Sequence, residues 1–238
     1  MVQILCFPHP RASTRHFISC WLRYNLMMKE VVTSIIFFAL AFGFVSLTET
    51  QVITMEKYIP VMIFLILVSI ITLLLFKDVT INYFKNLNWK RSLILISSSL
   101  LVHFLVSYVV INFFPRPEWP FSSKGASFLL MNNYYVWAKP LDVFVQQLFI
   151  LLLVLRLSKF GLSLKNITIL FMFGFGLIHI FQIFKTDLII GLTFTVGAIV
   201  SSFIYPYMIL KKNNGFAYNF MIHLLMYNIA SILAYTLY

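Results

Sequence analysis

Charged residues are scarce in this chain, and acidic residues are the scarcest. Of its 238 residues only 11% are charged, with 7 Asp+Glu against 18 Lys+Arg, while 61% are hydrophobic. A soluble domain of this length has too little interior to bury so many apolar side chains. The composition therefore excludes an ordinary soluble domain and predicts a membrane protein of the all-α class.

Cysteine is almost absent as well. The two cysteines, Cys6 and Cys20, both lie in a basic N-terminal tail, residues 1–30, so no disulfide framework is expected. The tail lacks the continuous apolar stretch and the cleavage site of a signal peptide. It also contains His9 and His16, but no hydrophobic core is present to hold these zinc-ligand types together. We interpret the tail as disordered or as an over-long gene start.

The net charge of +11 raises the question of an acidic partner. The basic residues stand singly or in pairs between long apolar runs and do not form a continuous patch. In such a pattern they determine membrane topology and contact anionic lipid headgroups. We therefore expect membrane lipid as a partner and no nucleic acid.

Apolar runs follow the tail, each long enough or nearly so to cross about 30 Å of hydrocarbon at about 1.5 Å per residue. They predict a polytopic transmembrane helix bundle over residues 31–238, with about seven membrane-spanning helices. The link at residues 185–187 is so short that its two flanking helices should be antiparallel neighbours. The runs lie at roughly 31–48, 59–76, 92–114, 140–157, 167–184, 188–210 and 216–236.

The distribution of Lys and Arg predicts the orientation. Cytoplasmic loops are enriched in these residues. If the tail is inside, 13 of the 18 basic residues fall on the inner side, which predicts a cytoplasmic N-terminus and an external C-terminus. The inner residues are Arg11, Arg15, Arg23, Lys29, Lys77, Lys85, Lys90, Arg91, Arg156, Lys159, Lys165, Lys211 and Lys212.

His179 lies well inside the fifth apolar run, Ile167 to Phe184. An imidazole in hydrocarbon needs a polar partner, because an unpaired polar group there costs several kcal/mol. Two other runs offer candidates. These are Gln146 and Gln147 on the fourth run, and His223 and Asn228 on the seventh.

Helix geometry is compatible with a single site for these residues. Counted from the predicted outer ends of their helices, Gln147, His179 and His223 lie at depths of roughly 12, 9 and 14 Å. Asp142 is one turn from Gln146, so the two share a face. On the third run Ser99, His103 and Ser107 also share a face, which we interpret as a set of interhelical hydrogen bonds.

Two of these runs carry short motifs. Phe175 to His179 reads Phe-x-x-x-His, and His223 begins a His-x-x-x-x-Asn sequence that ends at Asn228. The pattern resembles the CPBP family, the CAAX-protease and bacteriocin-processing group of intramembrane proteins, also called Abi. The family spacing places the Asn or Asp four residues after the histidine, where this chain has Tyr227.

The first family motif, two glutamates followed four residues on by arginine, aligns with the fourth run. Here the glutamates are replaced by Gln146 and Gln147 and the arginine by Leu151. The resemblance covers residues 139–230. It implies an intramembrane endopeptidase fold, a site of Gln146, Gln147, His179, His223 and Asn228, and His179 and His223 as ligands of a divalent metal such as zinc.

The glutamine replacements matter chemically. A carboxylate can act as a general base, whereas a neutral amide cannot take up and release a proton at working pH. Asp142 is the nearby acid that could substitute. Its other interpretation is a membrane-surface residue beside Lys139, and we favour the surface position.

Three functions therefore remain open. The first, which we favour, is a CPBP-like protein with altered or lost peptidase activity, whose pocket binds a lipid, a hydrophobic or prenylated peptide, or a partner transmembrane helix. The second is an active intramembrane endopeptidase that uses His179 and His223. The third is an unrelated polytopic or transport protein, in which the histidines cross-link helices or carry a proton.

Overall fold

The chain forms an all-α helical bundle in the computed structural model. The structure describes residues 58–115, 129–185 and 188–237, together with five residues between 32 and 39, and these described parts contain no strand. Six of the helical segments are long and apolar enough to cross a membrane. The elements are α2 (Tyr58–Leu75), α3 (Lys77–Lys85), α4 (Trp89–Phe113), the π-helix η2 (Tyr134–Ala138), α5 (Lys139–Lys159), α6 (Leu164–Lys185), α7 (Leu188–Lys211) and α8 (Gly215–Leu237).

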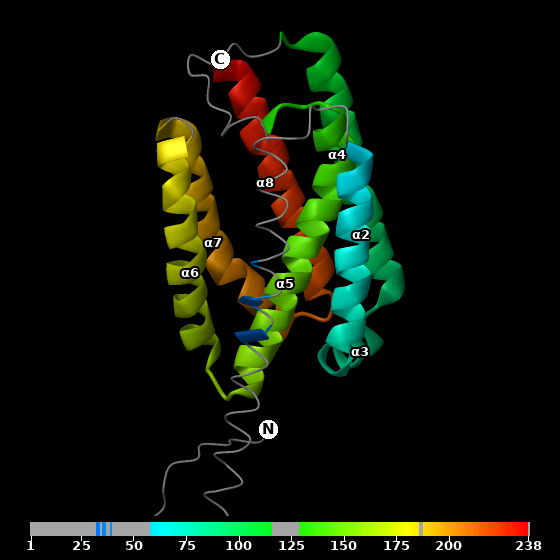
Figure 1. Ribbon diagram of the computed structural model, residues 1–238, viewed down its shortest axis with the longest axis vertical. Coiled ribbons are helices and arrows are strands. Elements are labelled where there is room, and N and C mark those ends of the chain that lie inside the picture. Colours follow the sequence, from blue (N-terminus) through cyan, green and yellow to red (C-terminus); the bar gives the residue numbers. More distant parts are fainter. Residues whose placement is uncertain are drawn as a thin grey trace, which may run out of the picture.

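The helices form three groups (Figure 1). The α6–α7 hairpin lies on one side, and α2, α3 and α4 lie on the other. Between them stand α5 and α8, with α8 packed on both α4 and α7, and α5 packed on α2, α7 and α8. Residues on α5 and α8 can therefore meet those on either flanking group.

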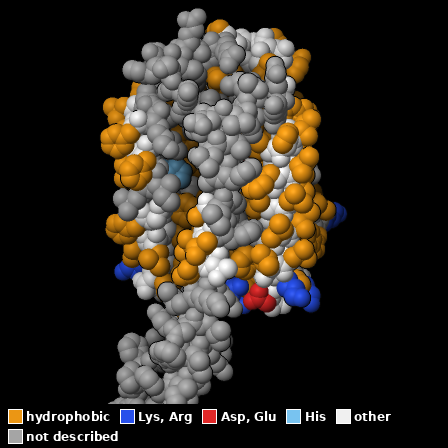
Figure 2. Space-filling model, viewed as in Figure 1, with side chains coloured by type: hydrophobic (Ala, Val, Ile, Leu, Met, Phe, Trp, Pro, Cys, Tyr) orange, Lys and Arg blue, Asp and Glu red, His pale blue; other side chains and the backbone are white. Residues whose placement is uncertain are grey.

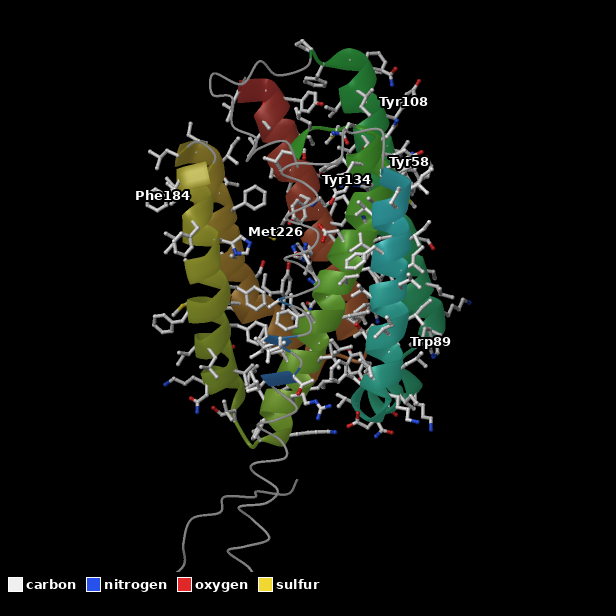
Figure 3. The ribbon with its side chains drawn as sticks, in the orientation of Figure 1. Tyr58, Trp89, Tyr108, Tyr134, Phe184 and Met226 are labelled. Atoms are coloured by element: carbon white, nitrogen blue, oxygen red, sulfur yellow. The ribbon has the colours of Figure 1, made fainter. Side chains whose placement is uncertain are left out.

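Large apolar side chains line both flanks of the bundle in the view of Figure 2. On α4, Trp89 and Tyr108 point away from the bundle, as does Phe184 on α6 (Figure 3). Phe184 is 80% exposed. Exposure of so many apolar side chains is compatible with lipid as the surrounding medium and not with water. The chain is therefore a multi-pass membrane protein.

Two glycines on α7 allow neighbouring helices to approach closely. A methyl group added at Gly191 would meet the backbone of Ile183 on α6, and one added at Gly197 would meet the Met226 side chain on α8. Small residues at helix contacts are typical of membrane bundles, where close packing stabilises association. Together these contacts hold α7 between α6 and α8, and they confirm that α6 and α7 are neighbours.

Charged side chains gather at the end of the bundle where α3 lies (Figure 2). Asp78 on α3 lies 3.8 Å from Arg156 and 3.9 Å from Lys159, both at the end of α5. In the same region the Tyr83 hydroxyl accepts a hydrogen bond of 2.9 Å from the backbone N–H of Phe216. The helix ends at this side are thus joined by polar contacts.

The expected spans agree with the structure for six of the seven runs. The first run, 31–48, and the tail, 1–30, with its candidate ligands and cysteines, lie almost wholly outside the described residues. The fourth span begins earlier than expected, because η2 continues directly into α5 and extends the helical segment back to Tyr134.

Candidate functional site

A cavity of about 80 Å³ lies between α5, α6, α7 and α8. Met226 on α8 points toward the α6–α7 hairpin, at the level of this cavity (Figure 3). The walls are mainly aromatic and aliphatic, with two imidazoles, an amide and a few hydroxyl groups. The lining residues are Gln146, Ile150, Phe171, Phe175, His179, Phe194, Ala198, Ser201, Ser202, Tyr205, His223, Met226 and Tyr227.

His179 enters the cavity from α6. Its Nδ1 lies 2.7 Å from the backbone carbonyl oxygen of Phe175, one turn earlier on the same helix. The carbonyl can only accept, so Nδ1 carries the proton of a neutral ring, and Nε2 keeps a free lone pair. The hydroxyl of Thr195 on α7 donates to the His179 carbonyl oxygen at 3.1 Å, which fixes this part of α6 against α7.

His223 reaches the same cavity from α8. Its Nδ1 lies 2.7 Å from Nε2 of Gln147, a fully buried side chain on α5. An amide N–H only donates, so Nδ1 is the acceptor and a neutral ring carries its proton on Nε2. The ring is stacked on Tyr227, with centroids 5.3 Å apart and planes inclined by 19°. These contacts fix both the orientation and the tautomer of the imidazole.

The two imidazoles are therefore complementary. His223 presents an N–H donor and His179 presents a lone-pair acceptor. Neither Nε2 has a hydrogen-bond partner among the described residues. The cavity is thus equipped to bind a group that can both accept and donate one hydrogen bond.

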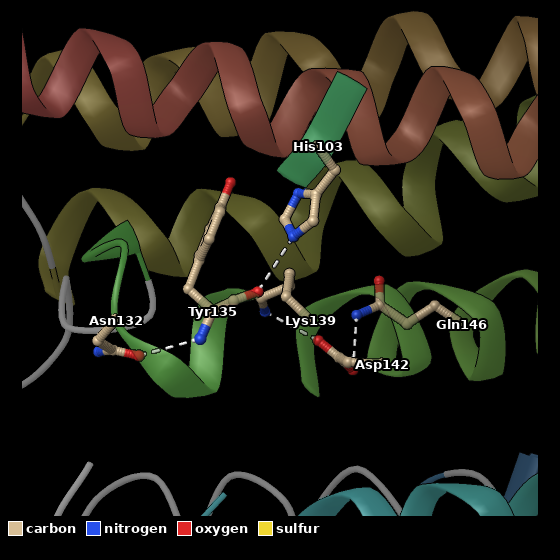
Figure 4. A network of polar contacts seen from close by, with 6 residues as sticks. All are labelled: His103, Asn132, Tyr135, Lys139, Asp142 and Gln146. Atoms are coloured by element: carbon tan, nitrogen blue, oxygen red, sulfur yellow. Dashed lines mark hydrogen bonds and ion pairs between the residues drawn. The ribbon is translucent and has the colours of Figure 1, made fainter. Parts of the chain in front are cut away.

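Asp142 forms a buried ion pair with Lys139 (Figure 4). The Lys139 Nζ donates to one carboxylate oxygen at 2.8 Å, and the two side chains are 3% and 6% exposed. Gln146 Nε2 donates to the other oxygen at 3.0 Å. The expected pairing with Lys139 is confirmed, but the expected surface position is wrong.

The start of α5 lies below the ends of α4 and α8 and not at the edge of the bundle, which explains this burial (Figure 1). Aromatic rings enclose the cation further. Lys139 Nζ is 4.5 Å from the ring centre of Tyr227 and 6.0 Å from that of Tyr134. Such contacts favour a cation where water is excluded. The apolar runs do not predict this enclosure, because η2 does not follow the apolar-run pattern.

Asn228 is not brought to the cavity. At about 100° per residue, five residues of α-helix turn it roughly 140° away from His223. Tyr227, four residues after His223, takes the cavity-lining position instead. The spacing of five residues between His223 and Asn228, in place of four, therefore puts Tyr227 at the cavity, and it was the signal in the sequence for Tyr227 as a site residue.

Asn228 belongs to a second polar cluster with His103. Its Oδ1 lies 2.8 Å from His103 Nδ1 and accepts a hydrogen bond from the Tyr135 hydroxyl at 3.2 Å. The other ring nitrogen of His103 lies 3.3 Å from the carbonyl oxygen of Tyr135 (Figure 4) and 3.2 Å from that of Val136. The expected interhelical role of His103 is confirmed, whereas Ser99 bonds the Ile96 carbonyl of its own helix.

The residues do not fit a zinc site. Catalytic zinc typically has three protein ligands, and His179 and His223 supply two. The described residues contain no group of three or more His, Cys, Asp or Glu side chains placed for a metal ion. Asp142 does not complete the set, because both of its oxygens are already bonded to Lys139 and Gln146.

Comparison with known proteins returned no match: no family model, curated protein or solved structure is similar to this chain. The described residues therefore define the class, a multi-pass helical membrane protein, by their own length and composition.

Proposed function

We propose that this membrane protein, which resembles the CPBP group in its histidine motifs, binds a largely apolar ligand with a hydrogen-bonding group in the cavity between α5, α6, α7 and α8, and does not cleave peptide bonds. The observation that supports this most directly is the pair of imidazoles in one cavity. His179 and His223 come from different helices, and each has one nitrogen free for a ligand.

The carboxylate chemistry of a protease is missing from this cavity. No Asp or Glu is among its described lining residues. Gln146 is used as a donor to Asp142, and Gln147 as a donor to His223. Neither amide can take a proton from water, so both glutamines position other groups and do not activate a nucleophile.

An active endopeptidase is the second candidate. It is favoured by the free Nε2 of His179, a lone pair that could take a proton from a water molecule in the cavity. His223 Nε2–H would then face the substrate carbonyl. For this function, the imidazoles alone would have to act as the general base, the role that a carboxylate can fill in the CPBP family motif.

The two candidates are separated by incubating the purified protein in lipid with prenylated and hydrophobic-helix peptides. We expect no cleavage by the unmodified protein and the same result for His179→Ala. Cleavage that His179→Ala abolishes, in a variant that still folds, would establish the endopeptidase. The double variant Gln146→Glu, Gln147→Glu shows whether the two carboxylates are sufficient to produce activity.

A further inference from the structure

The polar groups that line the cavity restrict the chemistry of its ligand. One N–H donor on His223 and one acceptor nitrogen on His179 are free, the buried Tyr205 hydroxyl also has no hydrogen-bond partner among the described residues, and most of the remaining wall is apolar. A cavity of about 80 Å³ has room for about five water-sized groups. A polar head with its first few carbon atoms fits this space, whereas a folded peptide segment does not.

Charge restricts the ligand further. No Lys, Arg, Asp or Glu is among the described lining residues. Lys139 is bonded to Asp142 and enclosed by aromatic rings, so its cation is already compensated. An anionic or cationic head would enter this site without an opposite charge, at a large desolvation cost. The site therefore favours a neutral head.

Among neutral heads, a hydroxyl matches the two imidazoles best. It donates one hydrogen bond and accepts up to two, so it can pair with an acceptor such as His179 Nε2 and with a donor such as His223 Nε2–H. An ether or ester can only accept, and an alkane can do neither. We propose that the cavity binds a lipid whose polar head is a free hydroxyl, such as a long-chain alcohol.

The bilayer is the source of such a ligand. On α6, His179 lines the cavity, while Phe181, two residues later and on the opposite side of the helix, is 64% exposed on the outer surface. One helix layer of about 10–12 Å therefore separates the site from surrounding lipid. The aromatic wall at Phe171 and Phe175, whose rings stack at 5.0 Å, provides an apolar surface for the alkyl chain.

The inference rests on the proposed binding function and names its ligand. The test is a scintillation proximity assay with the full chain in detergent and tritiated hexadecanol as probe. Unlabelled hexadecanol, hexadecyl methyl ether, palmitate and hexadecane are competitors. We expect saturable binding, and competition by the ether that is weaker than competition by hexadecanol by about three- to tenfold, the worth of one hydrogen bond.

Two protein variants complete the test. His179→Phe keeps a planar ring and removes the acceptor, so it should weaken hexadecanol binding by about three- to tenfold and abolish the preference for alcohol over ether. Ser98→Ala, at an exposed position on α4, is the matched control and should bind as the unmodified protein does. The ether comparison needs no variant, so it remains decisive if His179→Phe fails to fold.

The possible outcomes show separately whether the proposed ligand is wrong and whether the proposed function is wrong. Equal competition by alcohol and ether, with His179→Phe unchanged, overturns the hydroxyl proposal. Stronger displacement by palmitate than by unlabelled hexadecanol, sensitive to His179→Phe, overturns the ligand class but keeps a binding pocket. Absence of saturable binding of tritiated hexadecanol overturns the ligand, and peptide cleavage detected beside it overturns the proposed function as well.

Discussion

Three histidines lie inside the described helices, and they divide into two kinds of site. Both ring nitrogens of His103 lie against protein groups, Nδ1 against the Asn228 side chain and Nε2 against backbone carbonyls of the η2 segment. His179 and His223 each use one nitrogen on the protein and line a cavity with the rest of the ring. The first arrangement cross-links helices, and the second leaves polar groups for a ligand.

The comparison shows that an ionisable residue within a membrane helix does not by itself identify a functional site. All three are imidazoles within helices that are long and apolar enough to span a membrane. What differs is whether every nitrogen has a protein partner and whether open space adjoins the ring. A histidine whose hydrogen bonds are complete contributes to stability, whereas one with a free nitrogen beside a cavity can bind or react.

The largest effect on stability is expected at Lys139. This residue lies between the His103 cluster and the cavity of His179 and His223, and its charge acts on both His103 and His223. Lys139→Met leaves the Asp142 carboxylate buried without its cation, which should reduce the free energy of unfolding by about 3–5 kcal/mol. Thermal unfolding in detergent, followed by circular dichroism, measures the loss.

The double variant Lys139→Met, Asp142→Leu is the control for this prediction. Replacing both members of a buried ion pair by apolar residues is often close to neutral. It should recover most of the stability that the single change loses. Equal destabilisation in the single and double variants would show that packing around Lys139, and not its charge, stabilises this region.

The next largest effect is expected at His103. His103→Leu fills a similar volume but leaves Asn228 Oδ1 without its histidine partner, together with two carbonyl oxygens. We expect a loss of about 2–3 kcal/mol in the free energy of unfolding, since contacts worth about 1 kcal/mol each are lost together, although Asn228 Oδ1 keeps its bond from the Tyr135 hydroxyl. The same denaturation measurement, beside Ser98→Ala, checks it. If the His103→Leu protein is as stable as the unmodified protein, His103 is not a structural cross-link, and the distinction between it and the cavity histidines is lost.

The sequence predicts the fold well and the site in part. Six spans follow from the apolar runs alone, because lipid requires long helices and their composition shows it. The meeting of His179 and His223 also agrees with their estimated depths. The enclosure of Lys139 could not be predicted, because it depends on the η2 segment, which apolar patterning does not encode. The separation of Asn228 from the cavity follows from its five-residue spacing after His223.

Tyr83 allows the contribution of a single hydrogen bond to stability to be measured at a place away from both the His103 cluster and the cavity. Burial raises its pKa from about 10 to about 12, and the bond from the Phe216 N–H opposes this. Tyr83→Phe should cost about 1 kcal/mol at pH 7. Since the folded state favours the protonated phenol, its contribution is complete below pH 10 and falls as the pH rises toward 12. Urea unfolding of both proteins at pH 7 and 11 measures the difference, which should shrink at pH 11.

The smallest effect on stability is expected at His179, although its nitrogen is central to the proposed binding. His179→Phe removes one bond to the Phe175 carbonyl on the same helix and adds apolar surface to an aromatic cavity wall. We expect the free energy of unfolding to change by less than about 0.5 kcal/mol, well below the change for His103→Leu. Parallel denaturation of the two variants tests this directly. If His179→Phe unfolds as easily as His103→Leu, then His179 is a second structural cross-link and the difference between the two kinds of site disappears.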